Sequence, residues 1–284
     1  MRTVPCAPML RGMSTQLTSY YDGPELTGRV RDALRQAGLD PERLRVDDLV
    51  AMDQCHALGL AGTVALAKLA ELRPGERVLD LGAGIGGPAR VLAARFGAHV
   101  TAVEPTARFR RLAAELNAAT GTADEIQIVD AYGHALPFAD GAFDLVWTQA
   151  VLPNVADVAP LAAEAHRVLA PGGRWALAET VAGPGGDPYF PVPWADGPED
   201  SHLLAPEALR TVLERPGFAA EVWEVGPAAV APAVAELSPA PADASPPVEL
   251  GLIMPDRDAR MASLGRSMAE QRIAPVLAVL RRSS

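Results

Sequence analysis

Glycines and carboxylates that could bind a cofactor gather in residues 77–87, RVLDLGAGIGG. An apolar run that contains Asp80 breaks into the glycines Gly82, Gly84, Gly86 and Gly87 before a helical segment. Because glycine has no Cβ, such a turn lets the backbone lie flat against a ligand. The pattern therefore indicates a nucleotide-type cofactor site, and other residues must decide which cofactor it binds.

Three classes of cofactor site compete for this turn. Gly82, Gly84 and Gly87 satisfy GxGxxG, which alone is a weak fingerprint of dinucleotide binding. A P-loop is excluded because no GK[ST] sequence follows. Asp80 would repel a pyrophosphate at the helix N-terminus. S-adenosylmethionine has no phosphate and carries an ammonium and a sulfonium, so an acidic, glycine-lined site suits it better.

Polar residues also end the next two predicted strands. Glu104 closes the second strand, where a carboxylate can accept hydrogen bonds from ribose hydroxyls of either NAD or an adenosyl nucleoside. Asp130 and Ala131 close the third strand and can meet an adenine edge. Active sites of parallel sheets lie at the carboxyl ends of the strands, so these residues are expected to face one site.

Alternating strands and helices must position these residues. The predicted strands are 77–81, 99–103, 126–129, 142–147, 174–180, 219–225 and 274–281. The predicted helical segments are 28–37, 45–72, 88–96, 107–120, 158–169, 206–214 and 256–271. Regular βα alternation predicts a parallel sheet with helices on both faces. Residues 182–198 are irregular, and the Pro/Ala-rich residues 227–248 read as a linker or the base of a lid.

Composition excludes several classes of protein. The formal net charge of −10 argues against nucleic acid as a partner. Two cysteines and no CxxC sequence predict neither a disulfide framework nor a metal site. No apolar run is long enough to span a membrane, so we expect a cytoplasmic protein. Either Met1 or Met13 could be the native start, and the oligomeric state, including a homodimer, stays open.

Four segments in order carry a family resemblance: VLDLGAGIGGPARVLA, VTAVEP, DAYGHALPFADGAFDLVWTQ and EAHRVLAPGGRWALAE. This series resembles the motifs of class I S-adenosylmethionine-dependent methyltransferases. MDQCHALG at 52–59, FPVPWADGPEDSHLLAPEALRTVLERPGF at 190–218 and LGLIMPDRDARM at 250–261 are similar to the ubiquinone/sterol/tocopherol-like and sarcosine–dimethylglycine-like small-molecule group. The resemblance covers roughly residues 19–282.

The resemblance implies an α/β fold with a Rossmann-like, seven-stranded, mostly parallel sheet whose last strand is antiparallel. Helices would cover both faces, with a helical N-terminal cap and a lid insertion. We expect a cap or lid at 1–72 and an S-adenosylmethionine-binding core at 73–226. A Pro/Ala-rich linker with a helical lid insertion would follow at 227–272, and the final core strand and tail at 273–284.

The resemblance also assigns cofactor-binding residues. Asp80, Gly82, Gly84 and Gly86 would line the amino-acid moiety. Glu104 would bind the ribose hydroxyls, with Pro105 beside it, and Asp130 and Ala131 would meet the adenine. Gln149 would lie under the methionine portion. Tyr20 and Tyr21 fall where such enzymes often have a lid over the cofactor.

Candidate catalytic residues are His56, His202 and Glu179. Methyl transfer mainly requires alignment, and a base only if the acceptor arrives protonated. Each candidate also has a structural interpretation, because a histidine can pack or stay solvated and a buried glutamate can cap a backbone. Trp194 could stack on the substrate, whereas Trp147 is expected in the core.

One departure from the family concerns the acceptor side. Members of this group often read WTQH where this chain has WTQA, so Ala150 replaces a candidate base or substrate contact, and Pro153 follows it. We therefore expect a methyltransferase for a small, largely apolar metabolite, with His56, His202, Trp194 and Ala150 on the substrate side. The alternative is a natural-product cyclase or rearrangement enzyme that binds the cofactor without transferring methyl. An NAD-dependent oxidoreductase is disfavoured by Asp80.

Overall fold

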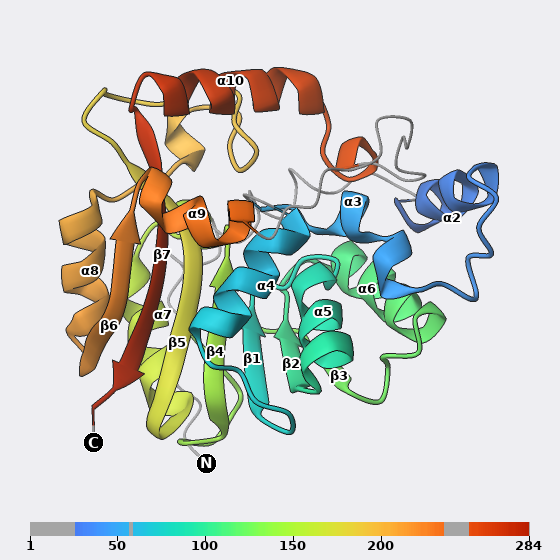
Figure 1. The fold of residues 1–284 in the computed structure, drawn as a ribbon, viewed down its shortest axis with the longest axis horizontal. Helices are drawn as coiled ribbons and strands as arrows, with labels where there is room; N and C mark the ends of the chain where they lie inside the picture. The colour runs from blue at the N-terminus through green and yellow to red at the C-terminus, as the bar shows by residue number, and fades with distance from the viewer. Residues whose placement is uncertain (1–25, 57–58, 236–249, 284) are drawn as a thin grey trace, which may run out of the picture.

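The computed structural model describes residues 26–56, 59–235 and 250–283, and its centre is a seven-stranded sheet of order β3-β2-β1-β4-β5-β7-β6 (Figure 1). Strands β1 to β5 pair in parallel, and β7 lies antiparallel between β5 and β6. The strands are β1 Arg77–Leu81, β2 His99–Val103, β3 Ile126–Val129, β4 Phe143–Gln149, β5 Leu169–Ala182, β6 Phe218–Val225 and β7 Ile273–Arg282. The expected mostly parallel sheet with an antiparallel last strand is confirmed.

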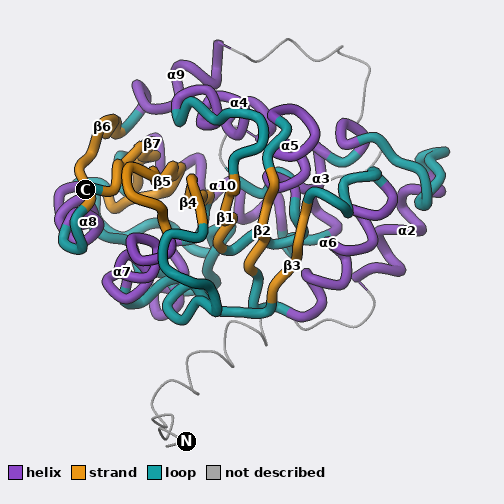
Figure 2. Tube along the Cα trace, turned by 90° about the horizontal axis from the view of Figure 1, so that it is seen from below, coloured by secondary structure: helices purple, strands orange, loops and turns teal. Residues whose placement is uncertain are grey.

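Helices cover both faces of this sheet, as predicted. Figure 2 shows α4, α5 and α9 on one side and α6 and α7 on the other. The α-helices are α2 Leu26–Gln36, α3 Val50–Asp53, α4 Gly59–Leu69, α5 Gly87–Phe96, α6 Ala107–Ala119, α7 Val158–Val168, α8 Pro206–Glu214, α9 Pro227–Ala235 and α10 Arg257–Ala269. Single 3₁₀ turns are η2 Val46–Asp48, η3 Leu152–Asn154, η4 Pro198–Asp200 and η5 Leu250–Leu252. Among the residues described, no helix is both long and apolar enough to cross a membrane.

Two apolar layers hold the sheet between its helices. Successive side chains of a strand point to opposite faces, and in β1 Leu79 packs in one layer while Val78 packs in the other. The first layer includes residues of α7 and α8, and the second includes residues of α4, α5 and α9. A third cluster joins α2 and α3 to α6, so the N-terminal helices dock beside β2 and β3.

Several elements differ from the prediction; β5, for example, begins at Leu169 instead of residue 174. The single helix expected at 45–72 is wrong, because Gln54 leaves the helical region (φ −92°, ψ 72°) and divides this stretch into η2, α3 and α4. Strand β4 continues to Gln149, two residues beyond the predicted end, because its backbone pairs with β5 as far as Ala178. Residues 227–235, expected to be part of a linker or the base of a lid, form α9, which packs on α4, β6 and β7.

Candidate active site

The glycine turn between β1 and α5 has the backbone that the sequence predicts. Gly82, Gly84 and Gly86 have φ of 71°, 57° and 82°, in the left-handed region that favours glycine. Gly87 is needed for another reason, because a Cβ built on it would lie 2.1 Å from the carbonyl oxygen of Asp53. The C-terminal end of α3 therefore rests directly on the turn.

Asp80 lies under this turn and its carboxylate is only partly satisfied. The side chain is buried, and its Oδ2 has no hydrogen-bond partner in the part of the chain that the structure describes. Burial, assisted by the nearby carboxylate of Glu104, raises the pKa of Asp80 to about 8. A buried acceptor without a partner costs free energy unless a ligand satisfies it. This arrangement fits a cationic group such as the ammonium of S-adenosylmethionine.

Glu104 follows β2 at the same edge of the sheet and holds the turn in place. Its two oxygens accept the backbone N–H groups of Gly84 at 2.9 Å and Thr106 at 2.8 Å. Burial raises the pKa of Glu104, while these hydrogen bonds oppose the shift. A carboxylate oxygen has two lone pairs, so each oxygen can still accept a hydroxyl donor. Pro105 follows it, half-buried.

Asp130, one residue beyond β3, is exposed and tethered by an arginine that the sequence interpretation missed. Arg110 donates to the carbonyl oxygen of Glu104 at 2.8 Å and to Asp130 Oδ2 at 2.6 Å. The half-buried Ala131 lies next to Asp130. The strand register brings these residues together, because Val103 pairs with both Leu81 and Val129.

Gln149 is the last residue of β4 and lies in a polar cluster with residues of the cap. Its Oε1 accepts hydrogen bonds from Trp147 Nε1 at 2.9 Å and Thr63 Oγ1 at 3.1 Å. Its Nε2 lies 3.3 Å from His56 Nδ1. The structure thus joins His56 to Gln149, although 93 positions separate them. Thr63 was not predicted as a site residue, because a lone threonine in an apolar helix carries no signal. Trp147 is a buried core residue, as expected.

The chain turns sharply after β4, in a segment that we call the β4 exit (residues 150–154). Ala150 adopts a left-handed φ of 57°, which is strained for a residue with a Cβ. Glu179 Oε2 holds this turn by accepting the N–H groups of Val151 at 2.9 Å and Leu152 at 3.1 Å. A Cβ at Gly82 would lie 2.8 Å from Val151, so the β4 exit contacts the glycine turn.

Glu179 is buried at the end of β5 beside the β4 exit. Burial raises its pKa to about 8, and the N–H groups of Leu152 and Val151 lower it only in part. Among the residues described, its Oε1 has no hydrogen-bond partner. The backbone-capping interpretation of Glu179 therefore matches its observed contacts, and one oxygen stays free for a further donor.

A loop at 183–202 brings Trp194 and His202 to the β4 exit. The backbone N–H of His202 donates to the carbonyl oxygen of Pro153 at 2.8 Å. Asn154 Nδ2 donates to the carbonyl oxygen of Trp194 at 2.8 Å. Trp194 Nε1 donates to Ser201 Oγ at 2.9 Å, and both Trp194 and His202 are half-buried.

Helix α10 anchors this loop and crosses the carboxyl end of the sheet (Figure 1). The buried Arg260 donates to the carbonyl oxygen of Val192 at 2.6 Å and pairs with Asp196. The Tyr189 N–H donates to the buried hydroxyl of Ser267 at 2.9 Å. Arg260 was missed because a charged residue on an amphipathic helix is usually solvent-exposed.

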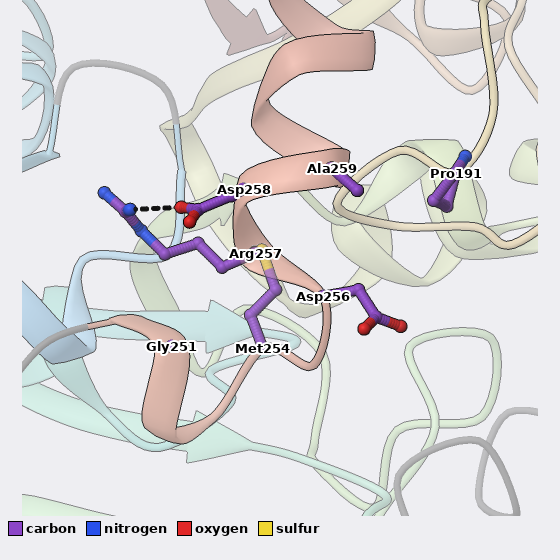
Figure 3. Close-up of a pocket in the computed structure, with 7 residues that line it drawn as sticks. All are labelled: Pro191, Gly251, Met254, Asp256, Arg257, Asp258 and Ala259. Carbon is purple, nitrogen blue, oxygen red and sulfur yellow. Dashed lines mark hydrogen bonds and ion pairs between the residues drawn. The ribbon is translucent and has the colours of Figure 1, made fainter.

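A pocket of about 610 Å³ lies where the loop and α10 approach each other (Figure 3). Pro191 borders it from the loop, and Met254 borders it from the segment before α10. Asp258 pairs with Arg257 at 2.8 Å on one side, while Asp256 points away from that pair. The walls of the pocket are partly apolar and partly charged.

The structure gathers most predicted site residues at one edge of the sheet. Asp80, Glu104 and Asp130 follow or end neighbouring strands, while His56, Gln149, Glu179, Trp194 and His202 lie around the ends of β4 and β5. Tyr20 and Tyr21 lie outside the described residues. The strand order, the glycine turn and the acidic strand ends together define a Rossmann-like fold of the methyltransferase class.

Comparisons with known proteins agree with this class. Residues 79–177 match the methyltransferase domain family. Dimethylglycine N-methyltransferase of Parasynechococcus marenigrum is 34% identical over 208 residues, which cover 72% of each chain. Sterol methyltransferase-like 1 of Botryococcus braunii is 36% identical over 123 residues, covering 43% of this chain and 32% of the relative. The match thus spans about a third of that algal protein.

The solved structure of the [4+2]-cyclase SpnF has the same fold. It superposes with a TM-score of 0.64 at 20% identity and covers 95% of this chain and 97% of its own. The chain belongs to the class I S-adenosylmethionine-dependent methyltransferases of the small-molecule group. S-adenosylmethionine is therefore its cofactor.

Proposed function

We propose that this enzyme transfers the methyl group in line to a small, largely apolar metabolite, an intermediate of secondary metabolism. The names of its relatives include both a sterol and an amino-acid substrate, so they do not choose between acceptor types. The observation that carries the proposal is the β4 exit, whose half-buried residues Ala150 and Val151 are apolar, while Leu152 and Pro153 are buried. Their segment touches the glycine turn and borders the acceptor side.

The arginines of α10 support an acceptor without a carboxylate. An amino-acid acceptor would call for a cation that remains available to pair with its acid group. In α10, Arg257 pairs with Asp258, Arg260 with Asp196 and Arg266 with Glu270. Each guanidinium therefore has a carboxylate of the chain itself as its partner.

In this proposal the cofactor-side residues hold S-adenosylmethionine, which supplies a methyl group already activated on a sulfonium. Asp80 accepts a hydrogen bond from the ammonium, and the backbone of Gly82, Gly84 and Gly86 lies along the amino-acid portion. Glu104 accepts from the ribose hydroxyls with Pro105 beside it, and Gln149 lies under the methionine portion. Asp130 and Ala131 meet the adenine.

The acceptor-side residues orient the second substrate and exclude water. Glu179 fixes the turn that shapes the β4 exit, Trp194 presents an aromatic face, and His202 contacts the acceptor. Alignment of two reacting groups can contribute about 7–11 kcal/mol to the lowering of a barrier. His202 removes a proton only where the acceptor atom carries one.

An isotope experiment tests the reaction. The enzyme is incubated with methyl-labelled S-adenosylmethionine and either a panel of apolar metabolites or dimethylglycine. We expect label in an apolar product. Label found only in trimethylglycine, the product of methyl transfer to dimethylglycine, would overturn the acceptor class. An unlabelled product with the cofactor recovered unchanged would show that the enzyme is a cyclase or rearrangement enzyme. This alternative is tested because Ala150 stands where members of the group often have a histidine.

A binding experiment tests the cofactor-side assignment. Glu104→Ala should weaken the binding of S-adenosylhomocysteine by about 1.5–3 kcal/mol, the range for hydrogen bonds to charged groups. Isothermal titration calorimetry measures the change. Glu125→Ala, an exposed carboxylate just before β3, is the matched control and should bind like the unmodified protein. Unchanged affinity of the Glu104 variant would refute the ribose assignment.

A further inference from the structure

We propose that His56 is a positioning residue: it fixes the side chain of Gln149 through a directed chain of hydrogen bonds from Trp147 to Asp53. The inference rests on the proposed place of Gln149 beside the cofactor. It changes the role expected for His56, from a base toward the acceptor to a group that orients another side chain. The direction of each of these hydrogen bonds follows from the atoms that can only donate and those that can only accept.

Trp147 fixes one end of this series of hydrogen bonds. An indole Nε1–H can only donate, and it lies 2.9 Å from Gln149 Oε1. The oxygen of the Gln149 amide therefore faces Trp147. Its nitrogen must then face His56 Nδ1, 3.3 Å away. This settles the orientation of an amide whose two ends are otherwise hard to distinguish.

The other end is fixed by Asp53. Its Oδ2 accepts from Arg90 at 2.9 Å, in an ion pair whose side chains are both fully buried. Burial raises the pKa of Asp53, and the Arg90 guanidinium, which always carries its charge, opposes that shift. The carboxylate of this ion pair can only accept, and its Oδ1 lies 3.1 Å from Gln54 Nε2. The amide nitrogen of Gln54 therefore faces Asp53. Its Oε1 must then face His56 Nε2, 3.2 Å away.

His56 lies between these two amides, and they determine its protonation. Nδ1 faces an amide nitrogen and must accept, while Nε2 faces an amide oxygen and must donate. The ring is therefore neutral, with its proton on Nε2. Thr63 Oγ1 lies 2.8 Å from Gln54 Oε1, 3.1 Å from Gln149 Oε1 and 3.1 Å from His56 Nε2. Its single proton goes to one amide oxygen at a time, and its lone pairs can accept from Nε2–H. Both ring nitrogens thus serve the protein's own groups.

The chain also connects two sides of the cofactor site. Arg90 belongs to α5, and its Nη1 would lie 2.9 Å from a Cβ on Gly86. The carbonyl oxygen of Asp53 lies against Gly87. The hydrogen bonds therefore run from the glycine turn, through the cap, to the end of β4. They set Gln149 relative to the turn before any ligand binds.

Substitutions of His56 separate a positioning role from a catalytic base. His56→Asn carries a carbonyl oxygen near the place of Nδ1, so it can still accept from Gln149. His56→Gln places its amide near Nε2, and His56→Ala removes both groups. None of the three can act as a base. We expect the Asn variant to bind S-adenosylhomocysteine within about threefold of the unmodified protein, and the Gln and Ala variants about 3- to 10-fold more weakly.

Equal losses in the Asn and Ala variants, or no loss in the Ala variant while Gln149→Ala binds weakly, would overturn the inference. If His56→Ala does not fold, the comparison of Asn with Gln decides. A double-mutant cycle of His56→Ala and Gln149→Ala on the free energy of unfolding, without ligand, tests the contact alone. Non-additive effects support it and additive effects overturn it. If the cycle shows that His56 and Gln149 are coupled but Gln149→Ala binds S-adenosylhomocysteine as well as the unmodified protein does, the proposed place of Gln149 beside the cofactor is refuted instead.

Discussion

Two regions meet at the carboxyl edge of the sheet and are built differently. The proposed cofactor half comprises the glycine turn and the carboxyl groups at the ends of β1, β2 and β3, and the hydrogen bonds of Glu104 and Asp130 reach groups within 20 positions. The acceptor half comprises the β4 exit, the loop at 183–202 and α10, which lie far apart in the sequence. Geometry in the first half follows from local motifs, whereas geometry in the second depends on packing between distant segments.

Asp80 and Glu179 are two buried carboxyl groups whose pKa is raised for the same reason, and they differ in their contacts. Burial raises the pKa of both Asp80 and Glu179 to about 8. Asp80 Oδ2 has no partner in the described residues, whereas Glu179 Oε2 holds the β4 exit. The first carboxylate is therefore suited to a cationic ligand and the second to shaping the backbone.

The largest effect is expected from Gly87→Ala in the cofactor half. The new Cβ would meet the carbonyl oxygen of Asp53 at 2.1 Å, and backbone cannot move as a flexible side chain can. We expect a loss of unfolding free energy above the ~3 kcal/mol usual for overpacking. Chemical denaturation measures it. Gly265→Ala, on α10 with open space around it, is the control and should stabilise by about 1 kcal/mol; a similar result for Gly87→Ala would contradict the packing of the cap on the turn.

The next effect is a pH dependence that both halves share. A carboxyl group whose pKa rises from about 4 to about 8 on folding stabilises the fold fully below pH 4. That contribution is lost as the pH rises toward 8. For each of the two groups, we expect the free energy of unfolding to fall by roughly 3.5 kcal/mol between pH 5 and pH 8, measured by urea titration.

The two groups separate in the variants. Asp80→Asn and Glu179→Gln should each reduce the dependence of the unfolding free energy on pH. If one variant leaves this dependence unchanged, the substituted residue does not contribute to it. S-adenosylhomocysteine should bind more tightly as the pH rises to about 8, because Asp80 must lose its proton to accept from the ammonium. Asp80→Asn should lose this dependence, while Glu179→Gln should keep it.

Arg260→Ala should affect the acceptor half alone. The substitution leaves the carbonyl oxygen of Val192 and the carboxylate of Asp196 without this donor, so we expect a loss of about 2 kcal/mol of unfolding free energy. Affinity for S-adenosylhomocysteine should not change. Arg257→Ala, with an exposed partner, is the matched control and should cost less than about 1 kcal/mol. Weaker cofactor binding in Arg260→Ala would break the division into two halves.

The smallest effect is expected at Ala150. Ala150→Gly relieves the left-handed φ of 57° but adds backbone freedom to the unfolded chain, so a net gain of about 0.5 kcal/mol is expected. Ala178→Gly, opposite Gln149 in β5, has no such strain and should destabilise by about 0.5–1 kcal/mol. Thermal unfolding compares the two. Equal destabilisation would show that Ala150 is not strained.

Local motifs made the cofactor half predictable from the sequence. The bounds of β1, β2 and β3 match the prediction, because short apolar runs end in glycine or a carboxylate. The left-handed backbone at Gly82, Gly84 and Gly86 follows from the residue type. The contacts of Arg110 were not predictable, because no pattern shows which surface arginine will reach back to two strand ends.

The acceptor half was less predictable for a physical reason. Glu179 looked like either a substrate contact or a cap, and only the β4–β5 register places it beside the β4 exit. Arg260 and Tyr189 join α10 to a loop about 70 positions earlier, and such pairs leave no periodic signal. One feature of the cofactor half was hidden from the sequence as well: the chain leaves the helical region at Gln54, and the carbonyl oxygen of Asp53 rests on Gly87, a tertiary contact that helix propensity does not register.

The position of β7 has a consequence for synthesis of the chain. β7 is made after β5 and β6 yet pairs with both, so neither strand has this neighbour while the polypeptide is still emerging. Until then β5 presents an unpaired edge, which is a template for pairing with another chain. Destabilising substitutions in β7 should therefore lower the yield of soluble protein during expression more than they alter the finished enzyme.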